Sequence, residues 1–87
     1  MNRVERIRAA LESALEPTKL EIEDQSHLHV GHAGAATGRG HFAVSIEAEA
    51  FRGQGPLAQH RLVYEALGTL METDIHALSI RASAPKT

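Results

Sequence analysis

The first part of the chain has the periodicity of an amphipathic helix. Apolar residues recur every three or four positions from Val4 to Leu15, and charged residues fill the positions between them. Asn2 precedes this stripe and is a suitable cap, whereas Pro17 disfavours helical geometry at the residue before it. The pattern therefore predicts a helix that begins after Asn2 and ends before Pro17.

Two later segments alternate between apolar and polar residues, as half-buried strands do. Residues 19–24 place Leu20 and Ile22 on one face and charged residues on the other. The alternation resumes from His41 to Phe51, where the inner-facing positions are Phe42, Val44, Ile46 and Ala48. We expect these two strands to pair as a hairpin with a long loop.

A second amphipathic helix is predicted from Pro56, which suits a first helical position, to about Glu72. Gly68 lowers helix stability by roughly 1 kcal/mol relative to alanine, so a break or a close contact is expected near it. The positions that define the inner face are Leu57, His60, Tyr64 or Val63, Leu67, and Leu70 or Met71.

Residues 75–82 alternate again and predict a last strand. His76 shares the phase of Leu78 and Ile80, so its ring is expected to lean toward the face that the helices cover. Because this strand follows a helical crossover, it can lie parallel to one of the first two.

The order of elements is helix, strand, strand, helix, broken helical turn and strand, or αββααβ. Two helices must cover one face of a three-stranded sheet, since neither element alone can hide its apolar side. We therefore predict an α/β fold of the α+β kind. The length of 87 residues fits a single domain over residues 1–87, with a loop at 26–40 and a tail at 83–87.

Composition excludes several classes of function. The chain has no cysteine, which rules out disulfides and any iron–sulfur cluster held by its own thiolates. The net charge of -2 disfavours a strongly basic nucleic-acid binder. Neither a membrane-length apolar run nor a signal-peptide pattern is present, so we expect a cytoplasmic protein without membrane contact. Because no local nucleophile motif appears and the acids are scattered, we do not expect an enzyme.

Histidine is over-represented in and beside the predicted loop. Four of the six histidines lie there, at His27, His29, His32 and His41, and His76 begins the last strand. Residues 26–40 are rich in glycine and lack periodicity, which predicts a mobile loop. Neutral imidazole is a common ligand of transition metals, so these residues are candidate ligands. Their other interpretation is a solvated polar loop and a structural histidine at a strand edge.

A second candidate site is the glycine-containing turn before the second helix. A helix N-terminus with free backbone N–H groups can bind phosphate. The residues that could contribute are Arg52, Gly53, Gly55, His60 and Arg61. Pro56 removes one of the amides that this binding needs, and a turn followed by a helix start explains the same residues.

Several segments together resemble the BolA family over nearly the whole chain. They are DQSHLHVGH at 24–32, His41-Phe42, Phe51-x-Gly53, QHRLVY at 59–64 with Leu67, and IHAL at 75–78. One departure is Gln59, where the family usually has arginine, and this substitution weakens a nucleic-acid interpretation. The loop carries histidine without cysteine, so the chain is similar to the histidine-loop type of BolA protein.

The resemblance implies a fold similar to type II KH domains and a monothiol glutaredoxin, with glutathione, as partner. In the family this pair shares a [2Fe-2S] cluster, and the two histidines that correspond to its ligands are His32 and His76. The residues themselves leave His29 and His41 open as alternates for the loop ligand. We expect the isolated chain to hold no cofactor and to be a monomer or a weak dimer.

The resemblance also implies a role in transcription and stress response, with DNA as a further contact.

For the shared cluster, imidazole ligands must be neutral to bind metal, and the unperturbed pKa of histidine is about 6.5. We therefore expect the cluster to be lost between roughly pH 7 and pH 5.

Overall fold

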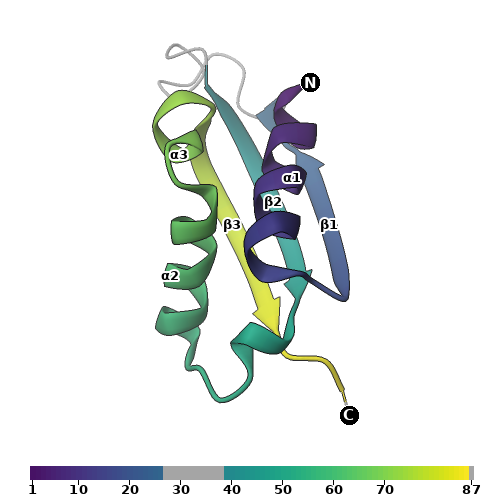
Figure 1. Ribbon diagram of the computed structural model, residues 1–87. Coiled ribbons are helices and arrows are strands. Elements are labelled where there is room, and N and C mark those ends of the chain that lie inside the picture. The colour runs from purple at the N-terminus through teal and green to yellow at the C-terminus, as the bar shows by residue number, and fades with distance from the viewer. Residues whose placement is uncertain (27–38, 87) are drawn as a thin grey trace.

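The computed structural model describes residues 1–26 and 39–86 (Figure 1). Its elements are, in chain order, α1 (Arg3–Leu15), β1 (Lys19–Asp24), β2 (Gly40–Glu47), the 3-10 helix η3 (Glu49–Phe51), α2 (Pro56–Leu67), α3 (Leu70–Thr73) and β3 (Ile75–Ser83). This order confirms the αββααβ prediction. Most of the predicted loop, residues 27–38, lies outside the described residues.

Helix α1 begins and ends where the sequence predicts. The Asn2 Oδ1 atom accepts from the Glu5 N–H at 2.8 Å, and the Glu5 carboxylate accepts from the Asn2 N–H at 3.2 Å, which is a capping box. After Leu15 the chain leaves the helix through Glu16, whose φ of 46° is left-handed, and Pro17 follows. The cap and the proline together fix the length of the helix.

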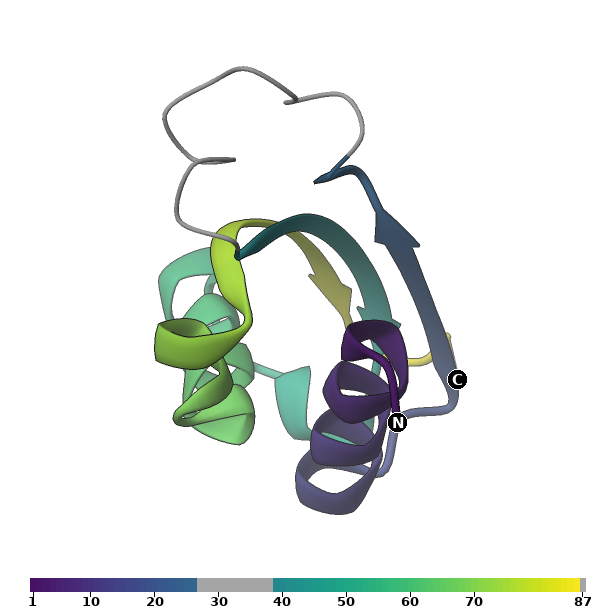
Figure 2. The same cartoon turned by 90° about the horizontal axis from the view of Figure 1, so that it is seen from above.

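The three strands form one mixed sheet in the order β1-β2-β3. Strand β1 is antiparallel to β2, and β3 is parallel to β2. The first pair confirms the predicted hairpin, and the helical crossover through α2 and α3 accounts for the parallel pair. Figure 2 shows the helices on one side of the sheet, and no helix or strand among the described residues covers the other side.

The core lies between this sheet and the helices. Its buried apolar residues are Ile7, Leu11, Phe42, Val44, Ile46, Ala48, Phe51, Val63, Leu67 and Ile75. The alternation predicted for β2 is confirmed, but its predicted end at Phe51 is wrong. Opposite Glu47, strand β1 begins at Lys19 and strand β3 ends at Ser83, so the ladder goes no further on either side. With no strand to pair with, the chain turns through η3, which packs Phe51 into the core.

The second predicted helix is two helices. Gly68 ends α2 with a φ of 53°, a conformation that favours glycine, and α3 follows as a single turn. The inner face of α2 carries Val63, whereas Leu57 and Tyr64 are 73% and 41% exposed. At about 100° per residue, Leu57 and Tyr64 share a stripe that lies roughly 100–120° away from Val63. The prediction that Leu57 faces the core is therefore wrong.

The last strand extends to Ser83, one residue beyond its predicted end, so the tail begins at Ala84. Within the described residues, no helix combines the length and apolarity that crossing a membrane requires.

Candidate metal site

His76 is the extra residue of a β-bulge at the start of β3. Gly40 pairs with Ile75 and the next residue, His41, pairs with Ala77, so His76 has no partner across the parallel ladder. Such a bulge bends a strand and redirects a side chain. Ile75 is buried, whereas His76 is exposed. The expectation that His76 faces the helices is therefore wrong, because the bulge shifts the alternation between Ile75 and Leu78.

The redirected ring lies beside a second imidazole. The ring centroids of His41 and His76 are 5.2 Å apart, and the ring planes are tilted by 44°. His41 is almost buried at 9% exposure, while His76 is open to solvent. Both residues lie at the end of the sheet where β2 and β3 begin (Figure 1). The structure thus brings His76 together with one of the predicted alternates, His41.

The backbone of His41 is fixed by the residues at the end of β1. Its N–H donates to Ser26 Oγ at 3.1 Å, and its carbonyl accepts from the Gln25 N–H at 2.7 Å. Ser26 is held in turn, because its N–H donates to Asp24 Oδ1 at 2.9 Å. These bonds hold His41 in place on its strand.

His76 is positioned through Asp74, two residues before it. The Asp74 carbonyl accepts from the Gly40 N–H at 2.9 Å, which joins the starts of β2 and β3. Its carboxylate accepts from Arg6 at 2.7 Å, from Arg3 at 3.2 Å and from the Thr73 hydroxyl at 2.9 Å. The Arg6 hydrogen bond is the main reason why the pKa of the Asp74 carboxyl is lowered, and the Thr73 and Arg3 bonds act in the same direction.

Arg39 contacts the outer side of the histidine pair. Its Nη2 atom lies 3.4 Å from Nδ1 of His76, and its Nη1 atom lies 3.4 Å from the carbonyl oxygens of Met71 and Glu72. A neutral imidazole that accepts from Arg39 at Nδ1 carries its proton on Nε2. Metal binding through Nε2 therefore requires the proton to move to Nδ1 and the guanidinium to turn away.

The separation of the two rings fits two imidazoles on one ion. With metal–nitrogen bonds of about 2.0–2.1 Å and a tetrahedral angle, the ring centroids would lie roughly 5 Å apart. Across residues 1–26 and 39–86, no group of three or more His, Asp or Glu side chains could hold a metal. The pair alone supplies two nitrogen donors, so any further ligands have to come from elsewhere.

The other predicted ligands, His29 and His32, lie outside the described residues, as does His27. The segment that carries them joins Ser26 to Arg39. Ser26 is hydrogen-bonded to the backbone of His41, and Arg39 contacts the ring of His76. The two attachment points of this segment therefore adjoin the histidine pair.

The predicted phosphate-binding residues lie at the opposite end of the sheet, around the start of α2. Arg52 is bound within the chain, since it forms an ion pair with Glu49 and donates to the Pro85 carbonyl at 2.9 Å. The Arg52 hydrogen bond also lowers the pKa of the Glu49 carboxyl. Gly53 has a φ of 77° and Gly55 caps α2. His60 is half-buried and Arg61 is exposed.

Sequence reasoning did not single out Asp74, Arg39 or Ser26. Asp74 looks like an ordinary turn residue, because the arginines that bind its carboxylate lie 68 and 71 residues away in sequence. The signal that was available is its position directly before the IHAL segment.

These observations define a class of protein: a small α+β domain with a mixed three-stranded sheet and a histidine pair at one end of it. The chain belongs to the BolA family, because the family model described as "BolA-like protein" matches residues 11–87. The expected membership is thereby confirmed.

Two curated relatives illustrate the range of the family. SufE-like protein 1, chloroplastic/mitochondrial, of Arabidopsis thaliana is 44% identical over 92% of this chain, and the chain spans only 23% of that protein. The DNA-binding transcriptional regulator BolA of Escherichia coli is 36% identical over 87% of this chain and 70% of its own length. Among solved structures, the BolA domain of SufE1 from Arabidopsis thaliana has a TM-score of 0.84 at 39% identity, covering 98% of this chain and 94% of that one.

Proposed function

We propose that this chain is a non-enzymatic adaptor that binds a monothiol glutaredoxin and contributes histidine ligands to a shared [2Fe-2S] cluster. The observation that carries this proposal is the bulge that turns His76 out of the core and toward His41. A histidine that only filled the core would need no such irregularity. The role would lie in iron–sulfur cluster handling or in iron, redox and stress regulation.

The chemistry of the donor set supports a shared rather than a private cluster. Such clusters are usually held by four thiolates, and this chain has none. A glutaredoxin cysteine and glutathione would supply thiolates, and this chain would supply imidazoles. The proposed ligands are His76 and His32, with His29 and His41 as alternates. When bound, the cluster supplies one-electron redox chemistry, and histidine ligation raises its reduction potential.

In this proposal, the residues around His76 position its ring and influence which ring nitrogen carries the proton. Asp74 and the bulge fix the start of β3, while Arg39 contacts Nδ1 of His76 in the absence of a partner. Docking of the partner would displace Arg39 and free this ring for ligation.

The name of the plant relative joins a SufE-like protein, a term from iron–sulfur assembly, to a segment similar to this chain. That name also places the relative in chloroplasts and mitochondria. It does not support the cytoplasmic location that the sequence led us to expect, and that location remains part of the proposal.

The test is anaerobic co-purification with a monothiol glutaredoxin and glutathione, followed by visible absorption. We expect a heterodimer whose spectrum differs from that of the glutaredoxin homodimer. His76→Ala should alter or abolish this spectrum, and His32→Ala should change it less, because His29 or His41 can substitute. His60→Ala, a histidine on α2 at the other end of the molecule, is the matched control. Unchanged spectra for both ligand variants would remove those residues as ligands.

The alternative function is a KH-like nucleic-acid-binding regulator of transcription, and the name of the Escherichia coli relative favours it. Its proposed contacts are the residues around the start of α2: Arg52, Gly53, Gly55, His60 and Arg61. The intramolecular ion pair of Arg52 argues against this surface, since a phosphate would have to compete with Glu49. Salt dependence separates the two functions, because only phosphate binding falls steeply as salt rises.

A further inference from the structure

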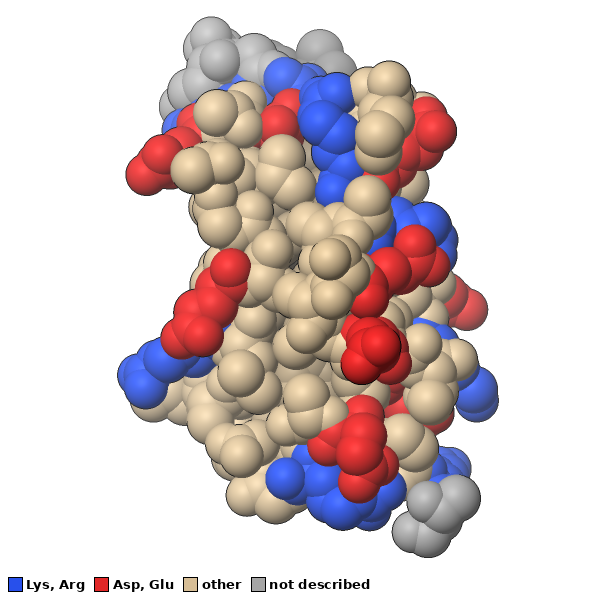
Figure 3. All heavy atoms as spheres, in the orientation of Figure 1, with Lys and Arg blue, Asp and Glu red and all other residues tan. Residues whose placement is uncertain are grey.

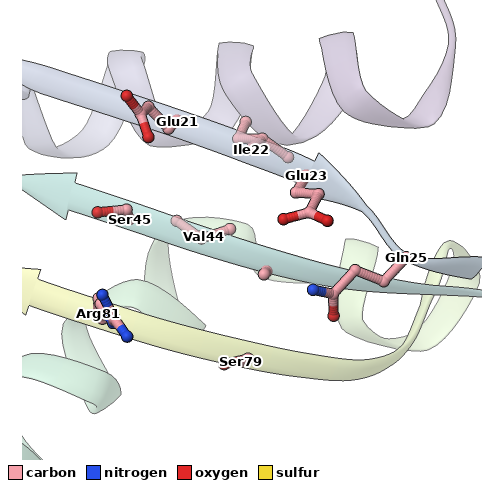
Figure 4. Close-up of a pocket in the computed structure, with 9 residues that line it drawn as sticks. Glu21, Ile22, Glu23, Gln25, Val44, Ser45, Ser79 and Arg81 are labelled. Carbon is pink, nitrogen blue, oxygen red and sulfur yellow. The ribbon is translucent and has the colours of Figure 1, made fainter.

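The uncovered face of the sheet carries opposite charges on its two outer strands. Glu21 and Glu23 stand on β1, whereas Arg81 stands on β3 (Figure 4). Between them, β2 presents the small side chains Ala43 and Ser45. At the far end of the same face, Glu47 of β2 lies beside Lys19 of β1. The result is an open trough of about 490 Å³ with an acidic side and a basic side.

The charges lie in register across the sheet. Glu21 pairs with Ser45, and Ser45 pairs with Arg81, so the three residues form one row. Glu21 and Arg81 are exposed, and neither forms an ion pair among the residues that the structure describes. The row therefore has a negative charge on β1, an uncharged residue on β2 and a positive charge on β3.

This arrangement is complementary to a second copy of itself. If two sheets meet face to face about a twofold axis that runs along β2, each β1 lies over the partner copy's β3, and every position along the strands is kept. Glu21 of one copy then faces Arg81 of the other, twice per dimer, and the two Glu47 side chains meet once, at the end of the face beside Lys19. An axis across the strands would instead place β1 over β1 and β3 over β3, which brings Arg81 against Arg81. Only the first arrangement places an acidic residue opposite Arg81.

We propose that the uncovered sheet face is a self-association surface through which two copies of this chain form a twofold dimer with reciprocal Glu21–Arg81 contacts. The small side chains of the central strand allow the two sheets to approach at the usual spacing of stacked sheets, about 10 Å. This inference does not depend on metal binding, because the row of Glu21, Ser45 and Arg81 contains no proposed metal ligand.

The area of the sheet face limits the affinity of the proposed dimer. Three strands at about 4.8 Å spacing and six to nine residues in length give a face of roughly 14 by 25 Å. This is below the roughly 800 Å² per partner of a standard stable interface, so the dimer is expected to be weak and transient. Its ion pairs are exposed at the edges of the contact, so association should weaken as salt rises.

Charge reversal in trans tests the arrangement. Sedimentation equilibrium at low salt from about 10 µM to 1 mM should show a monomer–dimer equilibrium. Glu21→Arg alone and Arg81→Glu alone should each weaken dimerisation by about tenfold or more, since like charges then face each other twice. An equimolar mixture of these two variants should associate again, because both arginines of the first variant then face both glutamates of the second.

Arg61→Glu is the control, because it makes the same charge change on exposed α2. All substituted side chains are exposed, and circular dichroism is used to check that each variant folds. Should one reversal variant fail to fold, Arg81→Gln and Glu21→Gln serve instead, each with a loss smaller than that of reversal. A chain that stays monomeric at 1 mM, an equal loss in Arg61→Glu, or a mixture that does not associate would each overturn the proposal.

Discussion

Asp74 does more for the candidate site than its place in a turn suggests. Its carbonyl joins the start of β3 to Gly40, and its carboxylate receives hydrogen bonds from two arginines of α1. The residue is 8% exposed, so this carboxylate is largely removed from water. A buried carboxylate needs such partners, because an unpaired one is costly. Asp74 therefore fixes the strand start from which His76 projects.

Asp74→Asn should lower the free energy of unfolding at pH 7 by about 1–3 kcal/mol, because charge-assisted hydrogen bonds become weaker neutral ones. The pKa of Asp74 is lowered in the folded state, so its contribution is complete above the unfolded value of 3.8 and is lost as the pH falls through the lower folded value. Urea unfolding between pH 7 and pH 2 should thus show a smaller loss of stability at acidic pH in the variant. Glu65→Gln, an exposed carboxylate on α2, is the control. Equal stability of Asp74→Asn and the parent at pH 7 would contradict the anchoring role.

The proposed histidine ligands give the shared cluster its own pH dependence. An imidazole must be neutral to bind iron, and acid protonates free imidazole in competition with the metal. Visible absorption of the heterodimer should therefore fall between roughly pH 7 and pH 5, while the all-thiolate glutaredoxin homodimer keeps its spectrum. Equal acid stability of the two complexes would count against histidine ligation.

At the scale of the elements, the bulge determines what the last strand presents. Alternation over residues 75–82 predicts Leu78 and Ile80 correctly, since both are partly buried against the core. It fails at His76, because periodicity assumes an unbroken ladder and a bulge adds one residue to a single strand. A one-residue irregularity has no compositional signature here. The sequence could therefore nominate His76 as a ligand but not the direction in which it points.

Gly40 is the residue of β2 at which the irregularity begins. A Cβ atom there would lie 2.6 Å and 2.8 Å from ring atoms of Phe42, and 2.8 Å from Ser26 Oγ. Both neighbours matter, because Phe42 belongs to the core and Ser26 holds the backbone of His41. A side chain at this position therefore disturbs the core and the site together.

Gly40→Ala should destabilise the fold by about 1–3 kcal/mol, the usual cost of overpacking a core. It should also shift the NMR resonances of His41 and His76. Gly55→Ala is the matched control, since nothing lies within 4 Å of its Cβ position and its φ of -75° suits any residue. Chemical denaturation measures both variants. Equal effects of the two substitutions would show that close packing at Gly40 is unimportant.

At the scale of the whole molecule, local patterns predicted the layers well. The α1 stripe, the β1–β2 hairpin and the break at Gly68 are confirmed. They could be predicted because each follows from a local pattern in the sequence. Contacts between distant segments were not accessible in this way. The link from Asp74 to Arg3 and Arg6, and the row from Glu21 to Arg81, exist only once the helix and the strands are assembled.

The distribution of charge over the whole molecule separates the two proposed functions. On the side that the helices cover, basic and acidic side chains are interspersed over the described residues (Figure 3). The net charge is -2, and Arg52 at the start of α2 is already paired with Glu49. This is a poor electrostatic footprint for a phosphate backbone, whose binding depends on clustered cations.

We therefore expect weak binding to duplex DNA with a shallow salt dependence. The logarithm of the binding constant falls by about 0.9 per decade of salt for each phosphate neutralised, so one or two contacts give a slope no steeper than about -2. Fluorescence anisotropy with a labelled duplex between about 50 and 200 mM salt measures this slope. Arg61→Ala should reduce the slope by about 1 if that exposed arginine contacts a phosphate, and His76→Ala should leave it unchanged. A slope of about -4 or steeper that depends on Arg61 would favour the nucleic-acid function, because four or more phosphates would then be neutralised by this chain.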